Sequence, residues 1–182
     1  MNPSHAWDIG SKGYRWRTER AMIQRVPDKV SFSGRMANTM TRVAPGVAKW
    51  FSRRQAATYE KSAGKSAAKL NGKPIFRLTV VGRKSGEPRS VMLMLVRRGE
   101  DLVVCGSQAG ASDVPNWWKN LVANGHATVQ VGPDTFETDA RVLTEETERA
   151  EAWQLLTAAY PDFGSYQLLT ERVLPIAVLT RS

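Results

Sequence analysis

The sequence predicts an α+β fold in which a small antiparallel β-barrel of six or seven strands is surrounded by two to four helices. Short runs rich in β-branched residues follow one another from residue 75 onward and are separated by glycine-containing turns. Several connections between these runs are too short for the crossover that parallel strands require. Because closing an antiparallel sheet removes its exposed edges, a barrel is the expected arrangement.

Six segments have the composition and length of strands. The second is joined to the third by "RRGED", and the fourth to the fifth by "GPD", so each of these pairs is expected to form an antiparallel hairpin. The predicted strands cover residues 75–81, 90–96, 101–107, 127–131, 135–143 and 175–180.

Two helices are expected between the strands. The first covers residues 113–125, with Asp113 as its N-cap and Gly125 at its end. The second covers about residues 145–160, with Thr144 as its N-cap and acidic residues in its first turn. The residues between this helix and the last strand are expected to connect the two.

The N-terminal third is strongly basic. Residues 1–70 hold 14 Lys and Arg against 4 Asp and Glu, whereas residues 71–182 hold 12 against 13, so the whole excess of +9 lies in the first part. We expect residues 1–70 to form a basic, partly helical extension that begins with a polar arm at residues 1–30, and residues 71–182 to form the barrel domain. Such an asymmetry favours contact with an anionic partner.

One amphipathic helix is expected in this extension, interrupted near Pro45. We expect its apolar face to dock on the barrel, because this is the usual place of such a stripe. Contact with an anionic membrane surface remains the alternative. The stripe consists of residues spaced three or four apart or adjacent: Met36, Met40, Val43, Val47, Trp50 and Phe51.

Several kinds of site and segment are not expected. The single cysteine, Cys105, excludes an internal disulfide, and the isolated His5 and His126 offer no metal site. The "GKS" at residues 64–66 has Tyr59 where a phosphate-binding P-loop needs glycine. Neither a secretory signal nor a membrane span is apparent, so we expect a cytoplasmic protein. An enzyme without hydrolytic residues would take its reactivity from a cofactor.

Two glycine-containing segments have the features of an anion-binding site. The turn "GRKSGEPR" at residues 82–89 combines cations, a hydroxyl and flexible backbone, although a solvated hairpin turn would look similar. The segment "CGSQAGASDVPNWW" at residues 105–118 leads from a strand into the N-terminus of a helix, where free amide groups favour an anion. An ordinary loop between a strand and a helix would have the same features. If both the turn and this segment bind anionic groups, they suggest one elongated anionic ligand.

These segments resemble a known family. "LTVVGRKSGEPRSVML", "GSQAGASDVPNWWKNLVANGHATVQV", "AAYPDFGSYQ" and "LPIAVL" are similar, in this order, to the deazaflavin-dependent nitroreductases of actinobacteria. The resemblance covers about residues 70–182. It implies a split β-barrel like that of FMN-binding proteins, and an oxidoreductase that uses coenzyme F420, a deazaflavin with a phosphate-linked oligoglutamate tail.

The resemblance also implies the residues of the site. The basic turn would hold the phosphate and tail, the following strand would line the cofactor, the loop after Cys105 would lie against the ring, and the start of the next helix would complete the pocket. The cofactor-binding residues implied are Arg83, Lys84, Ser85, Arg89, Ser90, Val91, Met92, Leu93, Met94, Cys105, Gly106, Ser107, Gln108, Asn116, Trp117, Trp118, Lys119, Asn120 and Phe163.

For the reaction, the resemblance implies hydride transfer to a quinone, an enone or a nitroheterocycle. Amide groups near Ser107, or the hydroxyls of Tyr160 and Tyr166, would stabilise the charge that develops on the acceptor. Phe163, Gln108 and Met94 depart from the tyrosine or lysine of some relatives.

Two further interpretations stay open. A barrel of this kind also suits FMN, and a basic arm with aromatic residues also suits nucleic acid, although we expect no nucleic-acid partner. Peripheral contact with the inner face of an anionic membrane would suit a lipid-soluble quinone.

Overall fold

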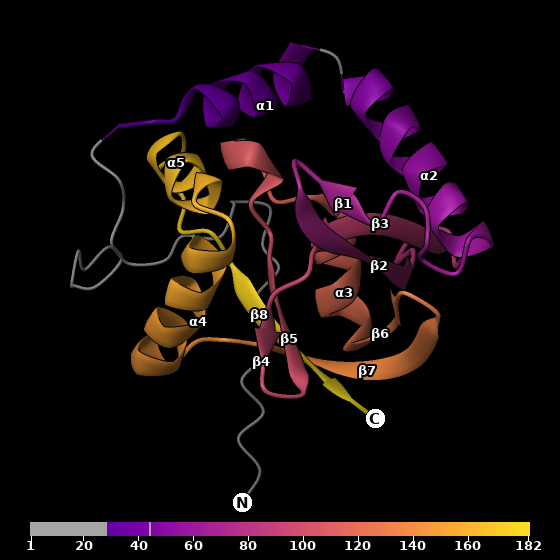
Figure 1. The fold of residues 1–182 in the computed structure, drawn as a ribbon. Helices are drawn as coiled ribbons and strands as arrows, with labels where there is room; N and C mark the ends of the chain where they lie inside the picture. Colours follow the sequence, from indigo (N-terminus) through magenta and orange to yellow (C-terminus); the bar gives the residue numbers. More distant parts are fainter. Residues whose placement is uncertain (1–28, 44) are drawn as a thin grey trace, which may run out of the picture.

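The computed structural model of the chain describes residues 29–43 and 45–182 (Figure 1). Most of the predicted polar arm therefore lies outside the described residues. Within the described part, eight antiparallel strands form one curled sheet: β1 (Lys69–Leu70), β2 (Lys73–Val81), β3 (Pro88–Met94), β4 (Arg97–Arg98), β5 (Asp101–Cys105), β6 (His126–Val131), β7 (Asp134–Val142) and β8 (Ile176–Arg181).

The sheet closes through one continuous stretch of chain. The strand order is β1-β2-β6-β7-β8-β5-β4, and β3 pairs with the other edge of β2. The chain then passes from β3 to β4, which pairs with β5, and the amide of Val103 donates to the carbonyl oxygen of Val96 at 2.9 Å. Residues 88–98 thus pair with β2 in their first half and with β5 in their second half. The predicted antiparallel barrel is confirmed.

The inside of the barrel is an apolar core. Side chains alternate along each strand, so Phe76, Leu78 and Val80 of β2 all point inward and are fully buried. Helix α3 (Asn116–Asn124) contributes Trp118 and Leu121 to the same core. Its N-cap is Pro115 and not the predicted Asp113, because the chain is still extended at Pro115, with φ −64° and ψ 153°. Gly125 ends the helix as predicted, in the left-handed conformation.

A second core lies on the outer face of β5 and β8, under α4 (Glu146–Ala159) and α5 (Asp162–Leu168). The cap of α4 is Glu145 and not the predicted Thr144, since the Glu145 carboxylate accepts hydrogen bonds from the amides of Thr147 and Glu148. Helix α5 occupies part of the segment that was expected to be a connection. Trp153 and Leu156 of α4 are fully buried there.

Helix α2 (Pro45–Lys61) packs on the outer face of β2 and β3 (Figure 1). The buried Tyr59 accepts a hydrogen bond at its hydroxyl from the amide of Gly132, at 2.7 Å. Glu60 forms an ion pair with Arg77 of β2 at 3.1 Å. The end of the basic extension is therefore joined to the barrel by specific contacts.

Helix α1 (Phe32–Val43) docks in a different orientation from the one predicted. Its apolar stripe is exposed: Phe32, Met36, Met40 and Val43 are 82%, 54%, 55% and 78% exposed. The side of α1 that faces the protein instead carries small and polar residues, such as the buried Gly34 and Asn38. The expectation that Met36, Met40 and Val43 dock on the barrel is therefore wrong. Val47, Trp50 and Phe51 lie in α2, where the structure does not describe their side chains. Among the described residues, no helix has the length and apolar character needed to cross a bilayer.

Candidate active site

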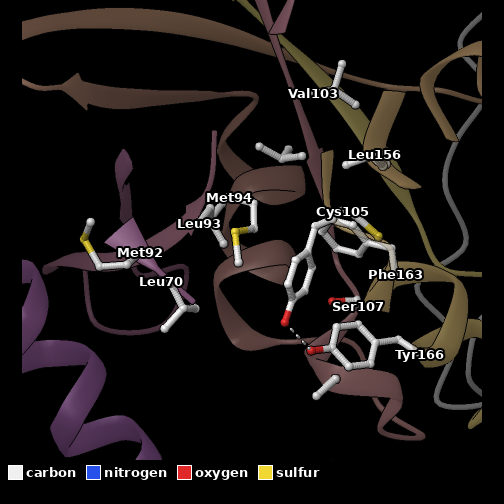
Figure 2. Close-up of a pocket in the computed structure, with 13 residues that line it drawn as sticks. Leu70, Met92, Leu93, Met94, Val103, Cys105, Ser107, Leu156, Phe163 and Tyr166 are labelled. Carbon is white, nitrogen blue, oxygen red and sulfur yellow. Dashed lines mark hydrogen bonds between the residues drawn. The ribbon is translucent and has the colours of Figure 1, made fainter. Parts of the chain in front are cut away.

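A cavity of about 180 Å³ lies between the outer face of the barrel and the two helices α4 and α5 (Figure 2). Figure 2 shows Leu70, Met92 and Met94 on one side of it and Phe163 and Tyr166 on the other. The lining is mainly apolar, which is typical of small-molecule and cofactor sites. It consists of Leu70, Met92, Leu93, Met94, Val103, Val104, Cys105, Ser107, Ala109, Leu156, Tyr160, Phe163 and Tyr166.

The cavity brings together part of the predicted site. Of the residues named from the sequence, it is lined by Met92, Leu93, Met94, Cys105, Ser107, Tyr160, Phe163 and Tyr166. The lining residues that sequence reasoning missed are Leu70, Val103, Val104, Ala109 and Leu156.

A sequence signal was available for one of the missed residues. Leu70 ends β1, and the turn to β2 is Asn71-Gly72, in which both residues have positive φ, 50° and 75°. Asn-Gly is the strongest short hairpin signal, so the hairpin that places Leu70 at the cavity could have been predicted.

Three aromatic rings form one wall of the cavity. Phe163 and Tyr166, on α5, pack edge to face at 6.2 Å and 90°, and Phe163 packs against Tyr160 at 5.6 Å and 87°. The hydroxyls of Tyr160 and Tyr166 are 3.4 Å apart. Burial raises the pKa of both phenols above the ordinary value, and the hydrogen bond to Tyr160 raises the pKa of Tyr166 further. Both are therefore hydrogen-bond donors at neutral pH and not bases.

The loop after β5 lies next to these rings, on the same side of the cavity in Figure 2. Gln108 and Ala109, in the short 3-10 helix η1 (Gln108–Gly110), have φ of 48° and 51°. Gly106 precedes this loop, and a side chain there would come within 3.0 Å of the Trp118 ring. Gly106 and Gln108 were predicted to contact the cofactor, but neither lines the cavity.

Cys105 is a buried thiol at the base of the cavity. Burial raises its pKa from about 9 to about 12, and the charges of Arg149 and Arg172 offset this only in part. The folded-state pKa lies above the unfolded one, so the contribution of Cys105 to stability is complete below about pH 9 and is lost as pH rises toward 12.

We therefore expect the melting temperature of Cys105→Ala to fall less than that of the unmodified protein between about pH 9 and pH 11. Thermal unfolding followed by circular dichroism at several pH values measures this difference. If the melting temperatures of the two proteins fell equally with rising pH, the thiol would not contribute to the pH dependence of stability.

The cationic turn lies at the other end of β3. Its backbone is held by hydrogen bonds from the amide of Gly82 to the carbonyl of Glu87 and from the amide of Gly86 back to Gly82, both at 2.8 Å. The guanidinium of Arg83 donates to Oδ1 of the buried Asn120 at 2.8 Å. Arg83, Lys84, Ser85 and Arg89 are all exposed, and none of them lines the cavity.

The strand β3 connects the turn to the cavity. Arg89 and Met92 are three residues apart, which corresponds to about 10 Å along a strand. Val91 packs against the inner core, whereas Met92 and Met94 line the cavity, and Leu93 contacts both. Ser90 shares a hydrogen bond with Thr79 at 2.9 Å. A ligand that reached both the turn and the cavity would have to be elongated.

The start of α3 lies outside the cavity lining. Asn116 is exposed, and Trp117 and Lys119 are half-buried. Trp118 is 2% exposed because it fills the inner core, so it supports the loop at Gly106 from behind. Of the helix-start residues named from the sequence, Asn120 has a direct contact with the cationic turn.

Comparison with known proteins identifies a matching family. The family model of the F420H2-dependent quinone reductases matches residues 50–181. An F420H2-dependent quinone reductase of Mycobacterium tuberculosis is 30% identical over 128 residues, which are 69% of this chain and 86% of the relative.

Two solved structures agree with this match. One is described as an F420H2-dependent reductase, FDR-A; it is 36% identical, has a TM-score of 0.55, and the match covers 58% of this chain and 93% of that one. The other, described as a domain-swapped dimer, is 30% identical, has a TM-score of 0.57, and the match covers 74% and 99% of the two chains. The family model spans most of the sequence, including the cavity and the cationic turn. The chain therefore belongs to the F420H2-dependent quinone reductase family and is an oxidoreductase with the split-barrel fold.

Proposed function

We propose that the cavity and the cationic turn form one active site, in which a quinone-type acceptor is reduced at the expense of reduced F420. The observation that carries this proposal is the position of β3, which lines the cavity with Met92 and Met94 and begins at the cationic turn with Arg89. When bound, the reduced cofactor supplies a hydride.

The residues present fit the two chemically different parts of F420. The cavity, at about 180 Å³, is smaller than usual ligand pockets of roughly 300–1,000 Å³, so it suits part of a ring system and not the whole cofactor. Arg83, Lys84 and Arg89 are exposed, and their charge suits the anionic phosphate and oligoglutamate tail. Asn120 orients the Arg83 guanidinium at the turn.

The tyrosine pair would stabilise the reduced acceptor. An acceptor carbonyl gains negative charge as it is reduced, and a phenol that keeps its proton can donate a hydrogen bond to that oxygen. Both tyrosine hydroxyls lie at the cavity and have raised pKa values. Ser107 lies on the neighbouring loop and offers a further hydroxyl.

We expect Tyr166→Phe to lower kcat for menadione by about 10-fold to 100-fold while the KM for F420H2 changes little, because the lost hydroxyl is needed mainly in the transition state. Anaerobic steady-state kinetics measure both constants. Phe163→Tyr is the matched comparison, because it adds a hydroxyl to the same aromatic wall. An unchanged kcat in Tyr166→Phe would contradict the assignment of this hydroxyl.

The function itself is tested by mixing the purified protein with F420H2 and either menadione or a nitroimidazole, and following the return of deazaflavin fluorescence. We expect faster oxidation with menadione. Copurification of a yellow flavin, together with failure to bind F420, would instead favour the FMN interpretation.

We also propose that α1 contacts an anionic membrane peripherally. Phe32, Met36, Met40 and Val43 recur at the spacing of one helix face and are exposed. Lys29 and Arg35, beside this stripe, are exposed cations. An apolar stripe flanked by cations is typical of helices that bind the membrane interface.

The double substitution Met36→Ser and Met40→Ser is expected to weaken sedimentation with phosphatidylglycerol vesicles by about 30-fold, since two partly inserted side chains contribute about 1 kcal/mol each. Leu155→Ser on α4 is the control, because Leu155 is also exposed but lies outside the stripe. Equal sedimentation of all three proteins would contradict membrane contact through α1.

A further inference from the structure

The loop from Ser107 to Ala111, which forms one wall of the cavity, is held by side chains from distant parts of the chain. Arg172 donates from Nη2 to the carbonyl oxygen of Ser107 at 2.7 Å and from Nε to that of Ala111 at 2.9 Å. Between them, Nδ2 of Asn38 donates to the carbonyl oxygen of Ala109 at 2.7 Å. Three alternate carbonyl groups of the loop are thus bound from outside it.

The conformation of the loop needs such support. Gln108 and Ala109 are consecutive non-glycine residues with positive φ, 48° and 51°. This conformation is unfavourable for residues with a Cβ atom, so it persists where surrounding contacts determine it. The hydrogen bond from Asn38 is made to the second of these two residues, and Ala109 itself lines the cavity.

Helix α1, which carries Asn38, is also attached to α5, which packs against the loop. The hydroxyl of Ser31, just before α1, donates a hydrogen bond to the buried carboxylate of Asp162 on α5, and the amide of Ser31 donates to Oγ of Ser165 at 3.0 Å. Figure 1 shows α1 lying across α5 and the short helix η1. Helix α5 carries Phe163 and Tyr166, so α1 holds both the loop and the aromatic residues that line this side of the cavity.

The family model begins at residue 50, so α1 lies outside the region that it matches. We propose that Asn38 is a positioning residue: by holding the Ala109 carbonyl, it keeps Ser107 and Ala109 in the cavity wall and sets the orientation of the bound ring and acceptor. The catalytic part of this inference rests on the proposed function, whereas the ordering of the loop does not.

The test compares Asn38→Ala, Asn38→Asp and Asn38→Gln with the control Thr39→Ala. Thr39 is exposed on the same helix, and its hydroxyl donates to the Arg35 carbonyl within α1. Aspartate keeps the shape of the side chain but loses the N–H donor, whereas glutamine keeps the donor. Amide hydrogen exchange of the segment 106–112 is measured without cofactor, and kcat and KM are measured with F420H2 and menadione.

We expect exchange of the loop amides to become about 10-fold faster in Asn38→Ala and Asn38→Asp, with unchanged exchange in the barrel strands. We expect kcat to fall about 10-fold with KM for menadione within about twofold, and Asn38→Gln to recover part of the loss. Thr39→Ala should match the unmodified protein in every measurement.

Wild-type exchange and kcat in Asn38→Asp would overturn the proposal, because the donor would then be unnecessary. Asn38→Gln behaving no better than Asn38→Ala would also overturn it. If the unmodified protein fails to oxidise F420H2, the proposed function fails, but the exchange measurement still decides whether Asn38 orders the loop.

Discussion

Replacing Arg83 and Lys84 together by alanine is expected to weaken F420 binding by roughly 30-fold, which corresponds to about 2 kcal/mol, or about 1 kcal/mol for each exposed cation. Both side chains are exposed, so the fold should be unaffected apart from the loss of the hydrogen bond between Arg83 and Asn120. The affinity of the double variant should also depend less on salt, because fewer charges take part in binding. Fluorescence titration at two salt concentrations measures both effects.

The matched control replaces Lys65 and Lys69 together by alanine. These lysines also belong to the basic N-terminal third, and neither is in the turn. An equal loss of affinity in the control would show that net charge, and not the turn, attracts the cofactor.

Replacing Gly110 by alanine is expected to lower the melting temperature by roughly 5–15 °C. Backbone strain at a positive φ and steric overlap of the added Cβ atom together destabilise the folded state by about 2–5 kcal/mol. Gly110 has a φ of 76°, and a Cβ atom there would lie 2.6 Å from the carbonyl oxygen of Tyr166 and 2.8 Å from Cβ of Leu169. The added methyl group therefore pushes η1 against α5, and we expect activity with menadione to fall as Tyr166 shifts. Calorimetry or thermal circular dichroism measures the change in stability.

Gly99→Ala separates the two causes. Gly99 has a φ of 62°, but an added Cβ would meet no atom within 4 Å, so this variant carries the backbone strain without the overlap. We expect it to be destabilised by about 1–2 kcal/mol. A Gly110→Ala protein as stable as Gly99→Ala would contradict the close contact between η1 and α5.

The strands could be predicted because their signal is local. Alternating β-branched residues and short hairpin turns depend on neighbours in sequence, and each predicted strand corresponds to an observed one within a few residues. Helix α5 lacked such a signal: five consecutive residues, from Asp162 to Tyr166, are buried, so no apolar stripe with helical spacing appears in the sequence.

The orientation of α1 could not be predicted from its pattern. An amphipathic pattern identifies an apolar face, but it does not say whether protein, lipid or another partner covers that face. In the structure, the contacts of α1 with the rest of the protein include hydrogen bonds from Ser31 and Asn38, and these depend on residues more than 70 positions away. Such contacts produce no periodic pattern in the sequence.

The candidate site was predictable in part. The resemblance named the continuous stretch from Ser90 to Met94; its last three residues, Met92, Leu93 and Met94, line the cavity, whereas Val91 packs against the core inside the barrel. Leu156 and Val103 were missed because they are ordinary apolar core positions in the sequence. Their role follows from the packing of α4 on the outer face of β5.

The central claim is that the cationic turn and the cavity bind the two ends of a single ligand. The most direct measurement is a fluorescence titration of the unmodified protein and the Arg83→Ala, Lys84→Ala double variant with intact F420 and with its deazaflavin chromophore lacking the phosphate and glutamate tail. We predict that the double substitution weakens binding of intact F420 by roughly 30-fold and leaves binding of the tail-free chromophore within about twofold. An equal effect on both ligands, or no effect on either, would contradict the claim.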